Sequence, residues 1–151
     1  MPRGARRTPL QQAVGLLQRR EHSRRELTQK LRARGAEADE VASALERLAG
    51  NGLQDDERFA QSLARQRCTA GYGLHAIEVE LKRHHLDDAV IGHAIDLLEA
   101  DWNQLAEGLL QRRFPHGLLS TADQRRASAL LSRRGFPADA VRHALDAMRQ
   151  S

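Results

Sequence analysis

The sequence predicts an all-α protein of three tandem three-helix repeats, each resembling a helix-turn-helix, in an elongated and curved array. An apolar pattern recurs every 50 residues, for example at Leu31, Leu81 and Leu131, and such internal self-similarity is typical of repeat proteins. Apolar residues follow the helical period throughout, whereas β-branched residues never alternate over more than a few positions. Aromatic residues make up only 3% of the chain, so the core must be aliphatic, which suits closely packed helices.

Five apolar positions define the repeat. They are Leu27, Leu31, Val41, Leu45 and Leu48 in the first copy, Ile77, Leu81, Ile91, Ile95 and Leu98 in the second, and Ala127, Leu131, Val141, Leu145 and Met148 in the third. Four residues after the second position stand Gly35, His85 and Gly135. A unit of this size has a small core, so we expect each repeat to depend on packing against its neighbours.

Three helices are predicted in the first repeat, residues 9–52. The first helix covers about residues 9–20 and begins with proline, whose missing amide costs nothing in the first turn. The second begins after Ser23, which can form a capping box with Glu26, and Gly35 can end it in the left-handed conformation. The third helix starts at about Asp39, a second cap candidate, and ends near residue 49.

The second and third repeats are predicted at residues 53–100 and 101–151. Asp55 and Asp56 place carboxylates at the positive end of a helix dipole and mark the start of the fourth helix. The remaining helices are expected to begin after Gly73, near Asp87, near Asp101, at Ser120 or Thr121, and near Pro137, and to end near His84, Leu98, Phe114, Gly135 and Met148.

The charge balance favours an anionic partner. The chain has 24 Lys and Arg residues against 20 Asp and Glu, and Lys occurs only at positions 30 and 82. The guanidinium of Arg matches phosphate and carboxylate in bidentate geometry. Residues 1–8, rich in Arg, Gly and Pro, are predicted to form a disordered basic arm. The alternative is that the charges only solvate helix surfaces.

Basic residues concentrate on the second helix of each repeat, whereas the third helices are acidic. An acidic third helix is poorly suited to reading the major groove of DNA, so a repeated basic face that follows a polymer is the better interpretation. The candidate partner-binding or DNA-binding residues of this basic face are Arg24, Arg25, Lys30, Arg32, Arg34, Lys82, Arg83, Arg112, Arg113, Arg125, Arg126, Arg133 and Arg134.

The sequence offers no sign of an enzyme or of a cofactor or metal site. The histidines lack metal-ligand spacing, no phosphate-binding loop follows a strand, and the single cysteine, Cys68, fits a reducing cytoplasm. No apolar stretch approaches the length needed to cross a bilayer. Trp102 is expected to anchor a junction between repeats, and Tyr72, between two glycines, either packs at a helix start or contacts a partner.

Several motifs in order resemble the RecX family over about residues 10–149. They are Arg25-Glu26-Leu27, Leu53-Gln54-Asp55-Asp56-Glu57-Arg58-Phe59-Ala60, Arg65-Gln66-Arg67, Gly71-Tyr72-Gly73 with Ile77, Glu80 and Leu81, Arg112-Arg113-Phe114, and Arg133-Arg134-Gly135-Phe136. The family usually has Pro and Arg at the places of Leu74 and Ala76, Gly-Ile at His85-Leu86, and Phe at Ala129. These departures lead us to expect a differently closed middle turn and no family contact from Ala76.

The resemblance implies a negative regulator of the RecA recombinase. Members of this family bind in the groove of the RecA–DNA filament, inhibit ATP hydrolysis and strand exchange, and limit filament growth or promote disassembly. The implied partner is the RecA filament, with weak and nonspecific binding to single- or double-stranded DNA. We expect a cytoplasmic monomer. The alternatives are a RecA-independent, sequence-nonspecific nucleic-acid-binding repeat protein and a helical scaffold for another protein.

Overall fold

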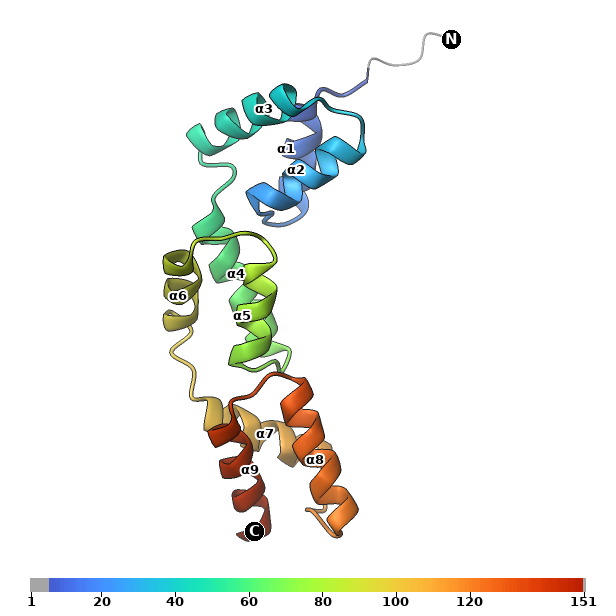
Figure 1. Cartoon of the computed structure of the whole chain (residues 1–151), viewed down its shortest axis with the longest axis vertical. Helices are drawn as coiled ribbons and strands as arrows, with labels where there is room; N and C mark the ends of the chain where they lie inside the picture. Colours follow the sequence, from blue (N-terminus) through green and yellow to red (C-terminus); the bar gives the residue numbers. More distant parts are fainter. Residues whose placement is uncertain (1–5, 151) are drawn as a thin grey trace.

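The computed structural model describes residues 6–150, and within this range it contains nine helices and no strand, which confirms the predicted all-α class. The helices are α1 (Pro9–Arg19), α2 (Arg24–Ala33), α3 (Ala38–Gly50), α4 (Asp56–Thr69), α5 (Leu74–Lys82), α6 (Asp88–Asp96), α7 (Trp102–Arg113), α8 (Thr121–Arg133) and α9 (Ala138–Gln150). Figure 1 shows them in three successive groups along the long axis, with α1–α3 turned relative to the other six helices.

The helix starts follow local capping chemistry. The predicted capping box at α2 is confirmed, because Ser23 Oγ accepts a hydrogen bond from the amide of Glu26 at 3.0 Å and the Glu26 carboxylate accepts one from the amide of Ser23 at 3.3 Å. The prediction that Asp39 caps α3 was wrong. Glu37 holds the extended backbone required before the first turn, and Asp39 already lies inside that turn.

The predicted basic arm lies mostly outside the described residues, which begin at residue 6. Thr8, the last residue assigned to that arm, instead caps α1. Its hydroxyl accepts a hydrogen bond from the amide of Gln11 at 3.1 Å, and the Gln11 side chain accepts one from the amide of Thr8 at 3.0 Å. Thr8 is therefore the N-cap of α1 rather than part of the arm, and α1 begins at Pro9 as predicted.

The helix ends depend on residues with positive φ. Gly35 and Gly135 have φ values of 97° and 84°, as expected for glycines that end helices. The expectation of a differently closed middle turn was wrong in this respect, because His85 adopts the same left-handed conformation with φ of 54°. Helix α6 ends at Asp96, two residues earlier than predicted, because Leu97 and Leu98 belong to the turn that closes it, in which Glu99 also takes a positive φ.

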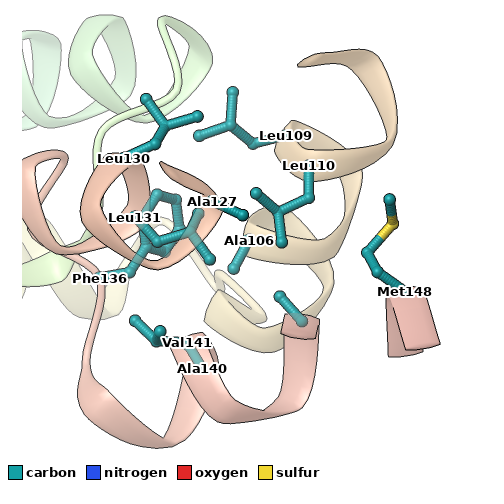
Figure 2. Close-up of a cluster of buried hydrophobic side chains, with 11 residues drawn as sticks. Ala106, Leu109, Leu110, Ala127, Leu130, Leu131, Phe136, Ala140, Val141 and Met148 are labelled. Atoms are coloured by element: carbon teal, nitrogen blue, oxygen red, sulfur yellow. The ribbon is translucent and has the colours of Figure 1, made fainter. Parts of the chain in front are cut away.

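Each group of three helices surrounds its own apolar cluster. The first and third helices of every group pack against each other, and helix packing is concentrated within the groups. Most positions of the repeated pattern are buried, although Ile95, Leu98 and Leu145 are only partly so. Figure 2 shows the cluster of the third group, where side chains from α7, α8 and α9 meet around Leu110 and Leu131.

The second and third groups are joined through helix ends. The carbonyls of Arg134 and Gly135, just after α8, accept hydrogen bonds from the amides of Gly73 and His75 at the start of α5, at 2.7 and 2.9 Å. The first amides and last carbonyls of a helix have no hydrogen-bond partner within the helix itself. Trp102 packs against the apolar clusters of both groups, as predicted for a junction residue, so the joint has a polar and an apolar part.

The first and second groups are joined through side chains at helix ends. Ser23 Oγ at the start of α2 lies 2.7 Å from Nδ1 of His84, just after α5. The carboxylate of Asp56 accepts a hydrogen bond from the amide of Arg24 at 2.8 Å and so caps a helix in the neighbouring group. Arg25 donates to Nδ1 of His85 at 2.8 Å. None of these contacts was predicted from the sequence.

Together the two joints place α8, α5 and α2 end to end. The last turn of α8 meets the first turn of α5, and the residues after α5 meet the first turn of α2, as Figure 1 also shows. The three helices therefore run with the same polarity, in the reverse of their order along the chain. We call this series the helix column.

The close approach at Gly73 should make this position intolerant of a side chain. An added Cβ would lie 2.5 Å from the amide nitrogen of Phe136, which is backbone and cannot move aside cheaply. We expect Gly73→Ala to lower the free energy of unfolding by about 2 kcal/mol, measured by urea denaturation followed by circular dichroism.

Gly92→Ala is the matched control. Gly92 lies inside α6, and a Cβ added there would meet no atom within 4 Å. Because alanine favours the helix, this change should stabilise the protein by about 0.5–1 kcal/mol. Equal destabilisation by both substitutions would contradict a specific close approach at Gly73.

The joint between the first two groups should weaken in acid. Burial lowers the pKa of His84 below its ordinary value of 6.5, although Glu26 and Glu80 oppose this effect, and the ring packs against Phe59 in a tilted arrangement with centroids 4.5 Å apart. Because the unfolded state binds the proton more tightly, the stabilisation is present above pH 6.5 and is lost as the pH falls below that value.

We therefore expect urea denaturation to show a smaller loss of stability between pH 7.5 and 5.5 for His84→Gln than for the unmodified protein. His116→Gln is the control, because His116 is exposed in the turn after α7 and should leave the loss unchanged. If His84→Gln loses as much stability over this pH range as the unmodified protein, His84 is not the cause of the acid sensitivity.

Candidate functional site

The predicted basic face lies mainly on the helix column. Its residues belong to α2, α5 and α8 or directly follow these helices, and only Arg112 and Arg113 lie elsewhere, in the last turn of α7. Ten of the thirteen side chains are exposed; Arg25, Lys30 and Arg134 are partly buried. The tertiary structure therefore brings together cations that are separated by as much as 110 residues between Arg24 and Arg134.

Arg25 and Lys30 take part in structural contacts. Arg25 reaches His85 across the joint, as described above. The ammonium of Lys30 lies 3.0 Å from Nε2 of the buried His22 and 3.7 Å from the carboxylate of Glu26. Burial lowers the pKa of His22, which favours the neutral ring that can accept a hydrogen bond from Lys30. These two cations are therefore less available to a partner than the sequence suggested.

Arg134 is also engaged in the structure. Its Nη1 donates to the carbonyl of Ala70 at 3.1 Å, and its guanidinium lies 4.8 Å from the centroid of the Tyr72 ring. Arg134 thus fastens the third group to the turn before α5. Tyr72 is 37% exposed and takes part in this packing, while its predicted contact with a partner stays a prediction.

The motif residues Arg67 and Glu80 form a further structural contact. Arg67 donates two hydrogen bonds to the Glu80 carboxylate, at 2.7 and 2.8 Å, and thereby ties α5 to α4. These hydrogen bonds lower the pKa of Glu80 against the opposing effect of burial, so the carboxylate stays ionised. The pair holds the middle helix of the column in place.

Most other cations of the basic face have no charged partner. Within residues 6–150, no ion pair or hydrogen bond is formed by the side chains of Arg24, Arg32, Arg34, Lys82, Arg83, Arg112, Arg113, Arg125 or Arg133. Arg126 is the exception, because it pairs with Asp123. The exposed carboxylates of the third helices lie on other elements, and Asp139 and Asp146 pair with arginines of α9 itself. A ligand with negative charges would thus meet free guanidinium groups on the column.

Two hollows are lined by three arginines each. One, of about 310 Å³, lies along α1 and is lined by Arg7, Gln12, Gly15, Leu16, Gln18, Arg19 and Arg34. The other, of about 330 Å³, lies between α7 and α8 and is lined by Arg113, Phe114, Arg126, Ala129, Leu130 and Arg133. Sequence reasoning missed Arg7 and Arg19. The spacing of Gln12, Gly15 and Arg19 on one helix face was the signal that could have found part of this set.

The described residues show neither a metal-binding cluster nor an activated thiol. Among residues 6–150, no three His, Cys, Asp or Glu side chains are grouped so that they could hold a metal ion. Burial raises the pKa of the Cys68 thiol, which disfavours the reactive thiolate. No helix in this part of the chain is long and apolar enough to cross a membrane.

Comparisons with known proteins agree with this architecture. Residues 10–48 match the family model described as RecX, first three-helix domain, and residues 55–95 match RecX, second three-helix domain. The chain is 48% identical over 136 residues to Regulatory protein RecX of Xanthomonas campestris pv. campestris (strain B100), which covers 89% of this chain and 84% of the relative.

A second relative and a solved structure extend the comparison. The chain is 48% identical over 138 residues to Regulatory protein RecX of Stenotrophomonas maltophilia (strain K279a), covering 91% of this chain and 85% of the relative. The crystal structure of RecX from Lactobacillus salivarius superposes with a TM-score of 0.76 at 21% identity, over 95% of this chain and 96% of that one. At this identity the structural likeness supports the fold alone.

The adjacent residues Arg133 and Arg134 should respond differently to mutation. Arg134→Ala removes the hydrogen bond to Ala70 and the contact with Tyr72, so we expect the free energy of unfolding to fall by about 1–2 kcal/mol. Arg133→Ala removes an exposed side chain without a partner and should leave stability unchanged. Thermal denaturation of the two variants measures the difference, and equal melting temperatures would contradict a structural role for Arg134.

Proposed function

The chain belongs to the RecX family of regulatory proteins, and on this basis we propose that it is a non-enzymatic negative regulator of the RecA recombinase in the cytoplasm. In this proposal it binds in the groove of the RecA–DNA filament, inhibits ATP hydrolysis and strand exchange, and limits filament growth or promotes disassembly. RecA binds the nucleotide, and the regulator supplies only a surface.

The observation that carries this proposal is the helix column with free cations in every group. Arg32, Lys82 and Arg133 belong to successive helices of the column, and none has an ion-pair partner among the described residues. A helical filament offers repeating anionic sites along its axis, and an elongated array can meet several of them at once. Linked contacts of this kind raise affinity without requiring a strong single site.

The joints support the same proposal. The hydrogen bonds of Gly73 and His75 with the end of α8 fix the third group relative to the second, and Ser23 and Asp56 fix the first. Fixed spacing lets several groups bind together with little further loss of conformational entropy. We propose that the protein acts as a monomer, because the three apolar clusters are covered within the chain, by the helices of their own groups and by Trp102 at the second joint.

The alternative function is sequence-nonspecific nucleic-acid binding without RecA. The unpartnered arginines of the column favour it, because contacts to a phosphate backbone require only positioned positive charge. The scarcity of aromatic residues weakens it for single strands, since base stacking contributes much of their affinity. Titration of this protein into RecA on single-stranded DNA, at two salt concentrations, distinguishes RecA regulation from nucleic-acid binding without RecA.

In that titration, ATP hydrolysis by RecA reports filament activity. Inhibition well below one copy per RecA subunit would indicate action at filament ends, and inhibition only near equal stoichiometry would indicate occupation of the groove. Tight DNA binding without inhibition of RecA would contradict the proposed function and leave the nucleic-acid-binding alternative.

Charge reversal on the column should weaken inhibition. We expect the combined substitutions Arg32→Glu, Lys82→Glu and Arg133→Glu to raise the concentration for half-inhibition of RecA ATP hydrolysis by about tenfold or more, because each group then repels an anionic filament. All three residues are exposed and form no ion pair, so the fold should be retained.

The control makes the same change in charge away from the column. Arg47→Glu, Arg65→Glu and Arg142→Glu replace exposed arginines on α3, α4 and α9. If net charge alone governs binding, both triple variants lose inhibition equally. If the column is the binding surface, the control keeps most of its inhibition.

A further inference from the structure

The hollow between α7 and α8 has features that a simple phosphate-binding surface does not need. Its volume of about 330 Å³ falls at the lower end of the range of ligand pockets, which begins at about 300 Å³. Arg113, Arg126 and Arg133 surround it, while Phe114, Ala129 and Leu130 give it an apolar lining. It thus combines three positive charges with room for one side chain.

The apolar lining is held in place by the core of the third group. Leu130 is only 8% exposed, and Phe114 packs against the same cluster of α7, α8 and α9. Ala129 is exposed and has a small side chain, so it leaves space open on the surface of α8. A ligand in the hollow would therefore meet a fixed apolar surface that is already formed, which lowers the entropy lost on binding.

The charges around the hollow favour a negatively charged ligand. Arg113 and Arg133 have no ion-pair partner among the described residues. Arg126 binds Asp123, which also accepts a hydrogen bond from the amide of Leu119, so this carboxylate neutralises one of the three cations in part. No Asp or Glu lines the hollow itself. Two guanidinium groups are thus free for carboxylates of a partner.

The hollow along α1 provides a comparison within the same molecule. It also has three arginines, Arg7, Arg19 and Arg34, but its other lining residues are mostly glutamine and glycine. That composition suits a ligand that offers only negative charge. The apolar lining at Phe114 and Ala129 instead favours an apolar group in the ligand. The complex is stabilised when the two apolar surfaces cover each other and leave water.

We propose that the hollow between α7 and α8 binds an acidic peptide segment in which an aromatic or aliphatic side chain stands between carboxylates. The apolar side chain fills the space over Ala129, beside Phe114 and Leu130, and the carboxylates pair with Arg113 and Arg133. The inference rests on the proposed function in one respect, because these arginines belong to the basic face. It adds a protein segment of defined chemistry as the ligand of one repeat.

The test uses a fluorescein-labelled peptide, Gly-Ser-Glu-Asp-Phe-Asp-Glu-Ser-Gly, and the full-length protein, with binding followed by fluorescence anisotropy. A second peptide with Ala in place of Phe carries the same charge, and a labelled abasic oligodeoxynucleotide serves as an anion of phosphates without bases or apolar side chains. We expect the Phe peptide to bind about tenfold more tightly than the Ala peptide, a difference of about 1.4 kcal/mol.

The decisive variant is Ala129→Phe, which fills the hollow and keeps every arginine. Because Ala129 is exposed on α8, the variant should retain its helical circular dichroism and melting temperature. It should lose about tenfold in affinity for the Phe peptide and none for the abasic oligodeoxynucleotide. Arg133→Ala should weaken binding of the Phe peptide by about fivefold, whereas Arg142→Ala, on α9, should leave this affinity unchanged.

Equal affinity for the Phe and Ala peptides, or undiminished binding of the Phe peptide to Ala129→Phe, would overturn the proposal. Parallel losses for the Phe peptide and the abasic oligodeoxynucleotide would overturn it as well, because they would show that only charge matters. These outcomes do not depend on RecA. Inhibition of RecA by the unmodified protein without peptide binding would leave the proposed function standing, whereas peptide binding without inhibition would remove that function alone.

Discussion

The satisfaction of helix ends across the joints is the constraint on which the rest of this structure depends. A helix leaves its first amides and last carbonyls without internal partners. Between α8 and α5 these groups pair directly, through Gly73, His75, Arg134 and Gly135. At the start of α2, the carboxylate of Asp56 from the neighbouring group supplies the missing acceptor. Small apolar clusters alone would leave the groups free to rotate, and these polar contacts fix their relative positions.

The column also explains why positive charge gathers where it does. Lys82 and Arg133 lie in last turns, where the partial negative charge of the helix dipole stabilises cations. Position near a helix end is therefore insufficient evidence of a binding role. The lack of an ion-pair partner and the exposure of the side chain are better criteria, and they separate Arg133 from Arg134, which is bound to Ala70 and Tyr72.

The two joints use different chemistry at equivalent positions. Gly135 approaches α5 so closely that an added Cβ would lie 2.4 Å from the amide nitrogen of Ala76, and its positive φ also favours glycine. His85 holds the same left-handed conformation, but its ring is exposed to solvent and accepts a hydrogen bond from Arg25. The joint at α2 therefore depends on titratable side chains, whereas the joint at α8 depends on backbone packing.

The sequence by itself determined the helical class, the threefold apolar pattern and most helix ends, because periodicity and capping are local properties that a linear pattern records. It also placed the basic residues on the second helix of each group. It could not assign Asp56 to the cap of α2, or distinguish Arg134 from Arg133. Both depend on contacts between residues that lie 32 and 64 positions apart in the chain. Only the tertiary structure decided which cations are engaged and where a hollow forms, since both depend on which helix ends meet.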